Sequence, residues 1–151
     1  MFTIFQAVKN RLPLTDMEKK HLFARLEEWM RKDPSHCWIL STNYQRLDWY
    51  FSPSMTPENG VMGCADPFHD AVYLMQEPHR EISQELRARF GGGYDKFWID
   101  QIWPIAVHEL RHIRQFRRSK VIYTILSLPV VREFTLERDA KAHTPSMAGE
   151  E

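Results

Sequence analysis

Apolar side chains recur at helical spacing in the first third of the chain, at Leu22, Leu26, Trp29 and Met30. Spacings of three and four residues place such side chains on one face of a helix, where they can pack against a core. Thr15 precedes this pattern and Glu18 lies three residues further on, which is typical of a capping box at a helix start. Pro34 cannot continue a helix interior. We therefore predict a first helix that starts after Thr15 and ends before Pro34.

Three short segments are rich in the aromatic and branched side chains that favour strands. They are residues 37–41 (CWILS), 47–52 (LDWYFS) and 70–76 (DAVYLMQ). Residues 52–60 (SPSMTPENG) have the composition of a loop instead. The middle of the chain therefore predicts a few short strands joined by loops.

Two further helices are predicted after these strands. Residues 77–93 carry Pro78 in the first turn and three glycines at the end, which is typical of a helix with a defined start and stop. The next helix lies within residues 98–120. Asp100 is a plausible N-cap for it, but Pro104 is also favoured in a first helical turn, so the helix starts at one or the other.

The last part of the chain is harder to interpret. The apolar segment at 121–127 fits either a helix or a strand. Ser127 followed by Pro129 is typical of a new helix start, and we predict a final helix that runs to residue 143. Residues 144–151 (TPSMAGEE) are predicted to be a flexible tail.

The order of helix, strands and three helices predicts an α+β fold, with a small, mostly antiparallel sheet packed on helices. A length of 151 residues is enough for one domain with a hydrophobic core, which we assign to residues 1–143. The two cysteines do not indicate a disulfide framework. We find no signal peptide, and the longest apolar run is too short to cross a bilayer, so we expect a cytoplasmic protein without a membrane span.

Equal numbers of basic and acidic residues, 20 of each, argue against attraction of the whole molecule to nucleic acid or anionic membranes. A local basic run is the exception, at Arg111, Arg114, Arg117, Arg118 and Lys120. We expect this run to be a solvated face. Contact with nucleic acid is the alternative, although no stacking-aromatic motif accompanies the run.

The segment AVHELRHIRQF at 106–116 carries the chemistry. His108 and His112 are one helical turn apart, so both imidazoles can face one metal ion. Glu109 follows the first histidine and can act as the general base on a metal-bound water. Two solvated histidines on a basic helix are the non-functional alternative. The preceding apolar residues favour a buried site helix, and therefore a Zn²⁺ site.

A catalytic zinc site needs a third protein ligand. The candidates lie in the last predicted helix, where Glu133 and Glu137 are four residues apart and Asp139 and His143 are close by. Donors for a developing oxyanion are also present, and the sequence does not choose among Tyr123, His143 and Arg111.

HELRH followed by a helix with ERDA resembles the zincin metallopeptidases, specifically the gluzincins, whose third zinc ligand is a glutamate. The resemblance implies a zincin-like fold and makes Glu137 the third ligand. Lys141 stands where the longer form of the family motif has aspartate. Glu133 therefore remains the alternative third ligand, and Glu137 would in that case contact a ligand rather than the metal. In this family an edge strand commonly binds substrate, and the resemblance implies that residues 70–76 form that edge.

These observations predict a zinc-dependent metalloendopeptidase that hydrolyses peptide or protein substrates. His108, His112 and Glu137 would bind Zn²⁺, and Glu109 would be catalytic. The first alternative is a catalytically inactive zincin-fold protein that binds zinc or a partner, as a regulator or an assembly component. The second is a metal-free helical module whose basic helix binds a partner.

Overall fold

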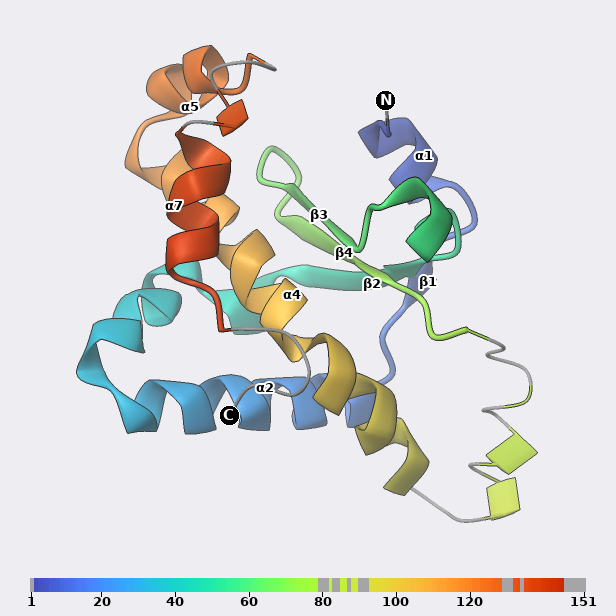
Figure 1. Ribbon diagram of the computed structural model, residues 1–151. Helices are drawn as coiled ribbons and strands as arrows, with labels where there is room; N and C mark the ends of the chain where they lie inside the picture. Colours follow the sequence, from blue (N-terminus) through green and yellow to red (C-terminus); the bar gives the residue numbers. More distant parts are fainter. Residues whose placement is uncertain are drawn as a thin grey trace.

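The computed structural model describes residues 2–78, 93–128, 132–133 and 135–145, together with positions 82, 85, 86, 88 and 89. A four-stranded sheet lies at its centre, in the order β1–β2–β4–β3 (Figure 1). The strands are β1 (Leu12–Pro13), β2 (Asp48–Ser52), β3 (Gly63–Asp66) and β4 (Ala71–Met75). The β1–β2 and β4–β3 pairs are antiparallel, whereas β2 and β4 are parallel. The predicted α+β class is confirmed, but the sheet is mixed rather than mostly antiparallel.

The helices surround this sheet unevenly. They are α1 (Ile4–Val8), α2 (Asp16–Lys32), α4 (Gly93–Arg118), α5 (Lys120–Leu126) and α7 (Leu136–Ala142), with short 3₁₀ helices η1 (Pro34–Thr42), η2 (Tyr44–Arg46) and η3 (Pro57–Asn59). α2 packs against α4, and α4 also contacts β3, β4, η1, α5 and α7 (Figure 1). α4 is therefore the central helix of the fold, in contact with the sheet and with most of the other helices.

Alternation along β2 and β4 divides the core between the two faces of the sheet. Trp49 and Phe51 of β2 join the large cluster that includes α2 and α4. Tyr50 of β2 and Tyr73 of β4 face the other way, where their rings stack at 5.3 Å near α1. All five residues of β4 are buried, because this strand has a neighbour on both sides and cover on both faces.

The first predicted helix is confirmed as α2. The Thr15 hydroxyl accepts from the backbone N–H of Glu18, and the Glu18 carboxylate accepts from the backbone N–H of Thr15. Residues 47–52 and 70–76 contain β2 and β4, as predicted.

The strand predicted at 37–41 is wrong, because these residues belong to the 3₁₀ helix η1. Pro34 starts η1, and the Asp33 side chain accepts from the backbone N–H of Ser35. The hydroxyl of Thr42 donates to the carbonyl of Ile39, which satisfies a backbone acceptor without a neighbouring strand. Ile39 is still fully buried, so the apolar composition reflects core packing rather than strand pairing.

Both predicted starts of the site helix are wrong, since α4 begins at Gly93 and Pro104 lies inside it. The final predicted helix is also interrupted. Thr135 has φ −123° and ψ −80°, outside the helical region, and α7 begins only at Leu136. The ambiguous segment at 121–127 forms α5. Most of the helix predicted at 77–93 lies outside the described residues, as do positions 146–151 of the predicted tail.

Residues 70–76 do not form an edge strand, contrary to the expectation from the family resemblance. β4 lies between β2 and β3, and β3 stands at the end of the sheet that packs against α4. None of the helices in the described ranges is long and apolar enough to cross a membrane.

Candidate metal centre

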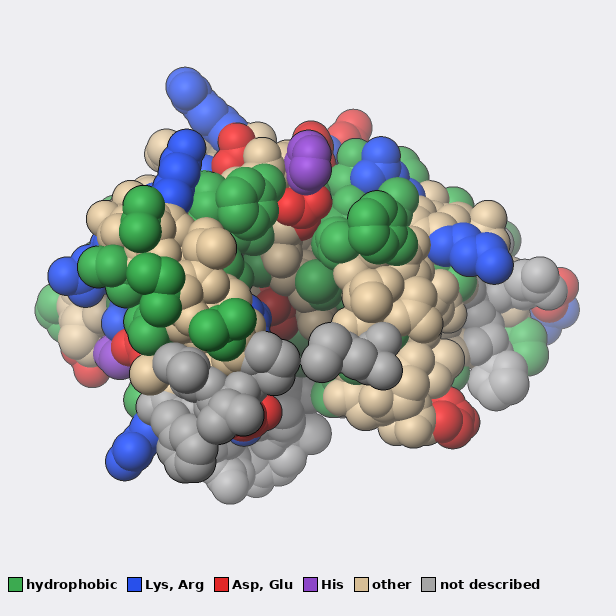
Figure 2. All heavy atoms as spheres, turned by 90° about the horizontal axis from the view of Figure 1, so that it is seen from above, with side chains coloured by type: hydrophobic (Ala, Val, Ile, Leu, Met, Phe, Trp, Pro, Cys, Tyr) green, Lys and Arg blue, Asp and Glu red, His purple; other side chains and the backbone are tan. Residues whose placement is uncertain are grey.

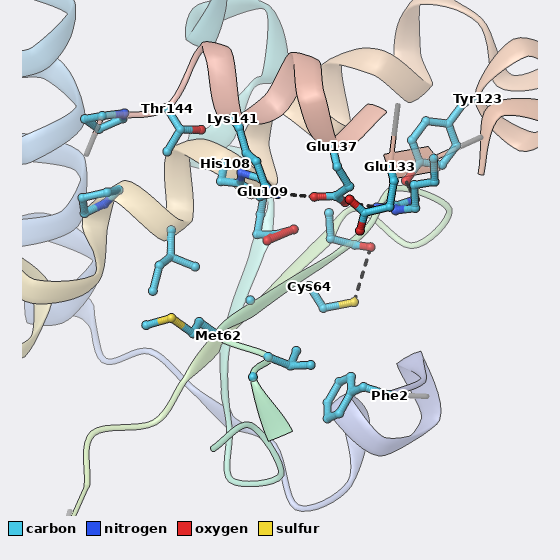
Figure 3. A pocket seen from close by; sticks show the side chains of 18 residues that line it. Phe2, Met62, Cys64, His108, Glu109, Tyr123, Glu133, Glu137, Lys141 and Thr144 are labelled. Carbon is cyan, nitrogen blue, oxygen red and sulfur yellow. Dashed lines mark hydrogen bonds and ion pairs between the residues drawn. The ribbon is translucent and has the colours of Figure 1, made fainter. Parts of the chain in front are cut away.

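α4 and α7 bring three potential metal ligands together, His108, His112 and Glu137. One side-chain ligand atom from each lies within 4.8 Å of the others. Nε2 of His108 is 3.1 Å from Oε2 of Glu137 (Figure 3). Nε2 of His112 is 3.0 Å from Oε1 of the same carboxylate. The imidazoles sit edge to face, with ring centroids 5.0 Å apart. Both nitrogens therefore converge on one carboxylate, with the spacing of residues i and i+4 on a helix.

The carboxylate of Glu137 is held in its ionised form. Burial opposes ionisation, but the contacts with His108, His112 and the guanidinium of Arg132 outweigh it and hold the pKa well below its usual range. For His108, burial works against the charged form, whereas the hydrogen bond to Glu137 and the charge of Glu109 raise its pKa overall. The ionised carboxylate of Glu137 therefore faces both imidazoles, and all three groups carry atoms that can bind a divalent cation.

His112 is the more constrained of the two histidines. Its Nδ1 lies 2.8 Å from Oε1 of Gln115, and its Nε2 is fully buried without a hydrogen-bond partner in the described structure. The amide of Gln115 is oriented because its Nε2 donates to the carbonyl of Leu136 at 2.9 Å and to Asp139 at 2.7 Å. The Gln115 oxygen must therefore accept from Nδ1–H of His112.

This orientation tests whether the residues present fit a metal. A neutral His112 with its proton on Nδ1 has a lone pair on Nε2, which then faces a carboxylate oxygen at 3.0 Å. Two acceptors at that distance repel each other unless a cation or proton lies between them. Zn²⁺ accepts imidazole nitrogen and carboxylate oxygen together, so the donor set fits this ion.

Gln115 should therefore govern metal affinity. Gln115→Leu removes the acceptor for Nδ1–H, frees the His112 ring and should weaken zinc binding by roughly 10–100-fold. Isothermal titration with Zn²⁺ measures this directly. Gln101→Leu is the matched control, because Gln101 is an exposed glutamine on the same helix. Equal affinities for wild type and Gln115→Leu would show that the hydrogen bond does not orient the ligand.

Glu109 lies beside this group without joining it. It is 6% exposed and packs under β3, where an added Cβ on Gly63 would stand 2.9 Å from Oε2 of Glu109. Burial raises the pKa of Glu109, and the positive charges of His112, His108 and Arg132 act against that rise. Its carboxyl group therefore holds a proton more readily than an exposed glutamate does, in a position largely shielded from water.

The close approach of β3 to α4 depends on Gly63. An alanine Cβ there would also lie 2.6 Å from Cγ2 of Ile105, well inside van der Waals contact. Gly63→Ala should therefore lower the free energy of unfolding by about 1–3 kcal/mol, measured by urea denaturation. Ile105→Ala in the same chain should recover part of the loss. Strictly additive effects would contradict a direct collision.

A pocket of about 890 Å³ opens beside these residues, between β3, α4, α5 and α7. Its wall includes His108, Glu109 and Glu137, together with apolar side chains such as Val61 and Ile105. Figure 2 shows a depression between two lobes on this side of the molecule, with acidic side chains visible inside it. Thr144 also lines the pocket, so the first part of the predicted tail belongs to the site (Figure 3).

Of the other predicted site residues, some line the pocket and others do not. Glu133 lines the pocket but is not part of the three-residue ligand group, which contains Glu137. Tyr123 also lines the pocket. Arg111 is instead engaged with Asp139 through bonds of 2.7 and 3.0 Å, and His143 bonds to the Asp139 carbonyl, so neither is among the pocket-lining residues.

Two site residues were missed by the sequence analysis. Arg132 lines the pocket, donates to Oε1 of Glu137 at 3.0 Å and lies 3.5 Å from the Tyr123 hydroxyl. Nothing in the sequence distinguishes it from the other arginines. Gln115, in contrast, follows His112 by three residues, and helical spacing alone could have marked it as a neighbour.

The thiol of Cys64 also faces the pocket (Figure 3). Burial and then the nearby charge of Glu109 raise its pKa to about 12. Cys64 is not part of the three-residue group of potential metal ligands.

No family model matches this chain, and neither a curated protein nor a solved structure shows significant similarity to it.

Proposed function

We propose that this protein is a zinc-dependent metallopeptidase of the gluzincin type, with His108, His112 and Glu137 as metal ligands. The observation that carries the proposal is the convergence of two imidazole nitrogens on one carboxylate, with the buried Nε2 of His112 3.0 Å from Oε1 of Glu137. When bound, Zn²⁺ would supply Lewis-acid activation of water and of the substrate carbonyl.

The chain's own residues have distinct parts in this reaction. Glu109 takes a proton from the attacking water and returns it to the leaving amine, for which its raised pKa and shielded position are suitable. The substrate carbonyl oxygen becomes negative during the attack. Arg132 and Tyr123, which share the pocket wall with Glu137, are the donors available to it.

β3 replaces β4 as the strand that we propose for substrate binding. It pairs with β4 on one side, and Gly63 and Cys64 of β3 line the pocket. An extended peptide lying along β3 would have its backbone next to Glu109. The apolar part of the pocket would then accept a substrate side chain.

The proposal is tested by zinc loading and cleavage together. We expect one Zn²⁺ per chain and hydrolysis of at least some members of a broad library of peptides and unfolded proteins. Fully zinc-loaded protein that cleaves nothing would replace the proposal with a non-cleaving zinc-binding protein. Failure to bind Zn²⁺, with the fold intact, would replace it with a metal-free interaction module.

A further inference from the structure

A second surface, at the end of α4 and the start of α5, is rich in basic side chains. Residues 110–132 contain no acidic residue but six basic ones, Arg111, Arg114, Arg117, Arg118, Lys120 and Arg132. Three of these are paired: Arg111 with Asp139, Arg117 with Asp70, and Arg132 with Glu137. In the described part of the chain, no carboxylate pairs with the other three. The end of α4 and the start of α5 therefore carry uncompensated positive charge.

α5 adds an apolar face to this charge. Its exposed aliphatic side chains are Val121 (69% exposed), Ile122 (57%), Ile125 (57%) and Leu128 just after the helix (58%). Val121 and Ile125 are four residues apart and lie on the side of α5 opposite Tyr123, which is 7% exposed and packs against Phe116. α5 is therefore amphipathic, with its inner face used by the core and its outer face left to solvent.

The position of α5 makes this face accessible. α5 lies at one end of the molecule, above the sheet, in Figure 1. Figure 2 shows hydrophobic side chains gathered on the lobe that includes α5, with basic side chains at its border. Burying four large aliphatic side chains against an apolar medium is strongly favourable, so an exposed cluster of this kind indicates a binding surface.

The charge decides between the possible occupants. A second copy docked through the same face in a two-fold dimer would bring Arg118 and Lys120 of both chains together without acidic partners. Nucleic acid would satisfy the charge, but it would leave Val121 and Ile125 against phosphates, and no aromatic side chain is exposed on α5 for base stacking. An anionic lipid bilayer satisfies both, because headgroup phosphates meet the cations and acyl chains meet the aliphatic face.

We propose that α5 and the basic end of α4 dock the protein on anionic membranes, with Val121, Ile125 and Leu128 entering the interface and Arg118 and Lys120 contacting headgroup phosphates. The convex helix needs no matching groove in a bilayer, whereas a protein partner would have to supply one. None of these docking residues is a proposed zinc ligand. Membrane binding should therefore be the same with and without zinc.

Vesicle flotation tests the proposal on the full chain. We expect binding to phosphatidylcholine vesicles that contain phosphatidylglycerol, weak or no binding to phosphatidylcholine alone, and weaker binding at higher salt. Val121→Ser with Ile125→Ser should weaken binding by at least about tenfold, because two aliphatic side chains no longer enter the interface. Arg118→Ser with Lys120→Ser should weaken it by about 25-fold, at about fivefold for each lost cation.

Matched controls test whether vesicle binding depends on this surface or on any exposed apolar or cationic side chain. Phe5→Ser removes an exposed apolar side chain of α1, and Lys9→Ser with Lys20→Ser removes two exposed cations elsewhere. Neither control should change vesicle binding. Equal losses in controls and surface variants would overturn the proposal, as would absence of wild-type binding to any vesicle. Concentration-dependent dimers, or binding to a DNA duplex, that the α5 variants abolish in the absence of vesicle binding would assign the surface to those occupants instead.

Discussion

Replacing Glu109 with glutamine should leave zinc binding intact and reduce peptide hydrolysis by at least about 100-fold. Glutamine keeps the size of the side chain beneath β3 but cannot accept a proton from water. Glu109 is not in the three-residue ligand group, so its loss should not remove the metal. Zinc content by atomic absorption and initial rates on a cleaved library peptide measure the two effects separately.

Glu133→Gln is the matched control for this change. Glu133 is one of three described glutamates on the pocket wall, with Glu109 and Glu137, and its substitution should leave the rate within a few-fold of wild type. A Glu109→Gln variant that cleaves at the wild-type rate would assign the activity to a contaminant or another site. Since the base must be ionised, and burial raises its pKa, the wild-type rate should fall as pH decreases through that pKa.

Glu137→Ala should lower zinc affinity by more than about 100-fold, whereas Glu133→Ala should change it little. Glu137 is the carboxylate within 3.1 Å of both imidazoles. If it is a direct ligand, as we propose, its removal should cost more than the 10–100-fold typical of a residue that only hydrogen-bonds to a ligand. Titration of both variants with Zn²⁺ gives the comparison. The reverse order would move the third ligand to Glu133, the fallback from the sequence.

The Glu137→Ala variant would leave two of the three proposed zinc ligands, His108 and His112. Without the carboxylate, His112 keeps its hydrogen bond to Gln115, whereas His108 loses its bond to Glu137. Residual binding through two imidazoles should therefore be weak and easily removed by a chelator. Loss of secondary structure in this variant, followed by circular dichroism, would point instead to a structural role for Glu137.

The elements with strong local signals were predictable from the sequence. α2 carries a capping box and one apolar face, and the pairing of Thr15 with Glu18 follows from three-residue spacing alone. The one-turn separation of His108 and His112 likewise predicts their common face without knowledge of the fold. The choice of Glu137 over Glu133 as third ligand depended on a short family resemblance and stays a prediction, although Glu137 is the glutamate that the structure groups with both histidines.

The elements that were predicted wrongly are those in which tertiary packing outweighs the local sequence preference. Residues 37–41 have strand-like composition, but their apolar side chains fill the core from a 3₁₀ helix whose hydroxyls satisfy its own carbonyls. Pro104 is tolerated inside α4, where proline lacks the N–H that the helix ladder uses, because α4 packs against the sheet and α2 along its length. Local propensity cannot reveal such compensation.

Strand order was the least predictable feature of the fold. Short segments with alternating apolar residues reveal that strands exist but not which strands are neighbours. β3 was not predicted at all, because Gly63, Cys64, Ala65 and Asp66 have no strand-like composition. Its place beside Glu109 is therefore visible only in three dimensions, although it forms part of the pocket wall.

The position of β4 has a consequence for how the chain reaches this fold. β4 is the last strand in sequence but occupies the sheet interior between β2 and β3. During synthesis from the N-terminus, β2 and β3 emerge first, and each keeps an unpaired edge until residue 75 has left the ribosome. Such edges are templates for pairing between nascent chains. Insertion of β4 therefore covers the edges of β2 and β3 that face it, and in the part of the chain that the structure describes the only strand edges left are the outer edges of β1 and β3.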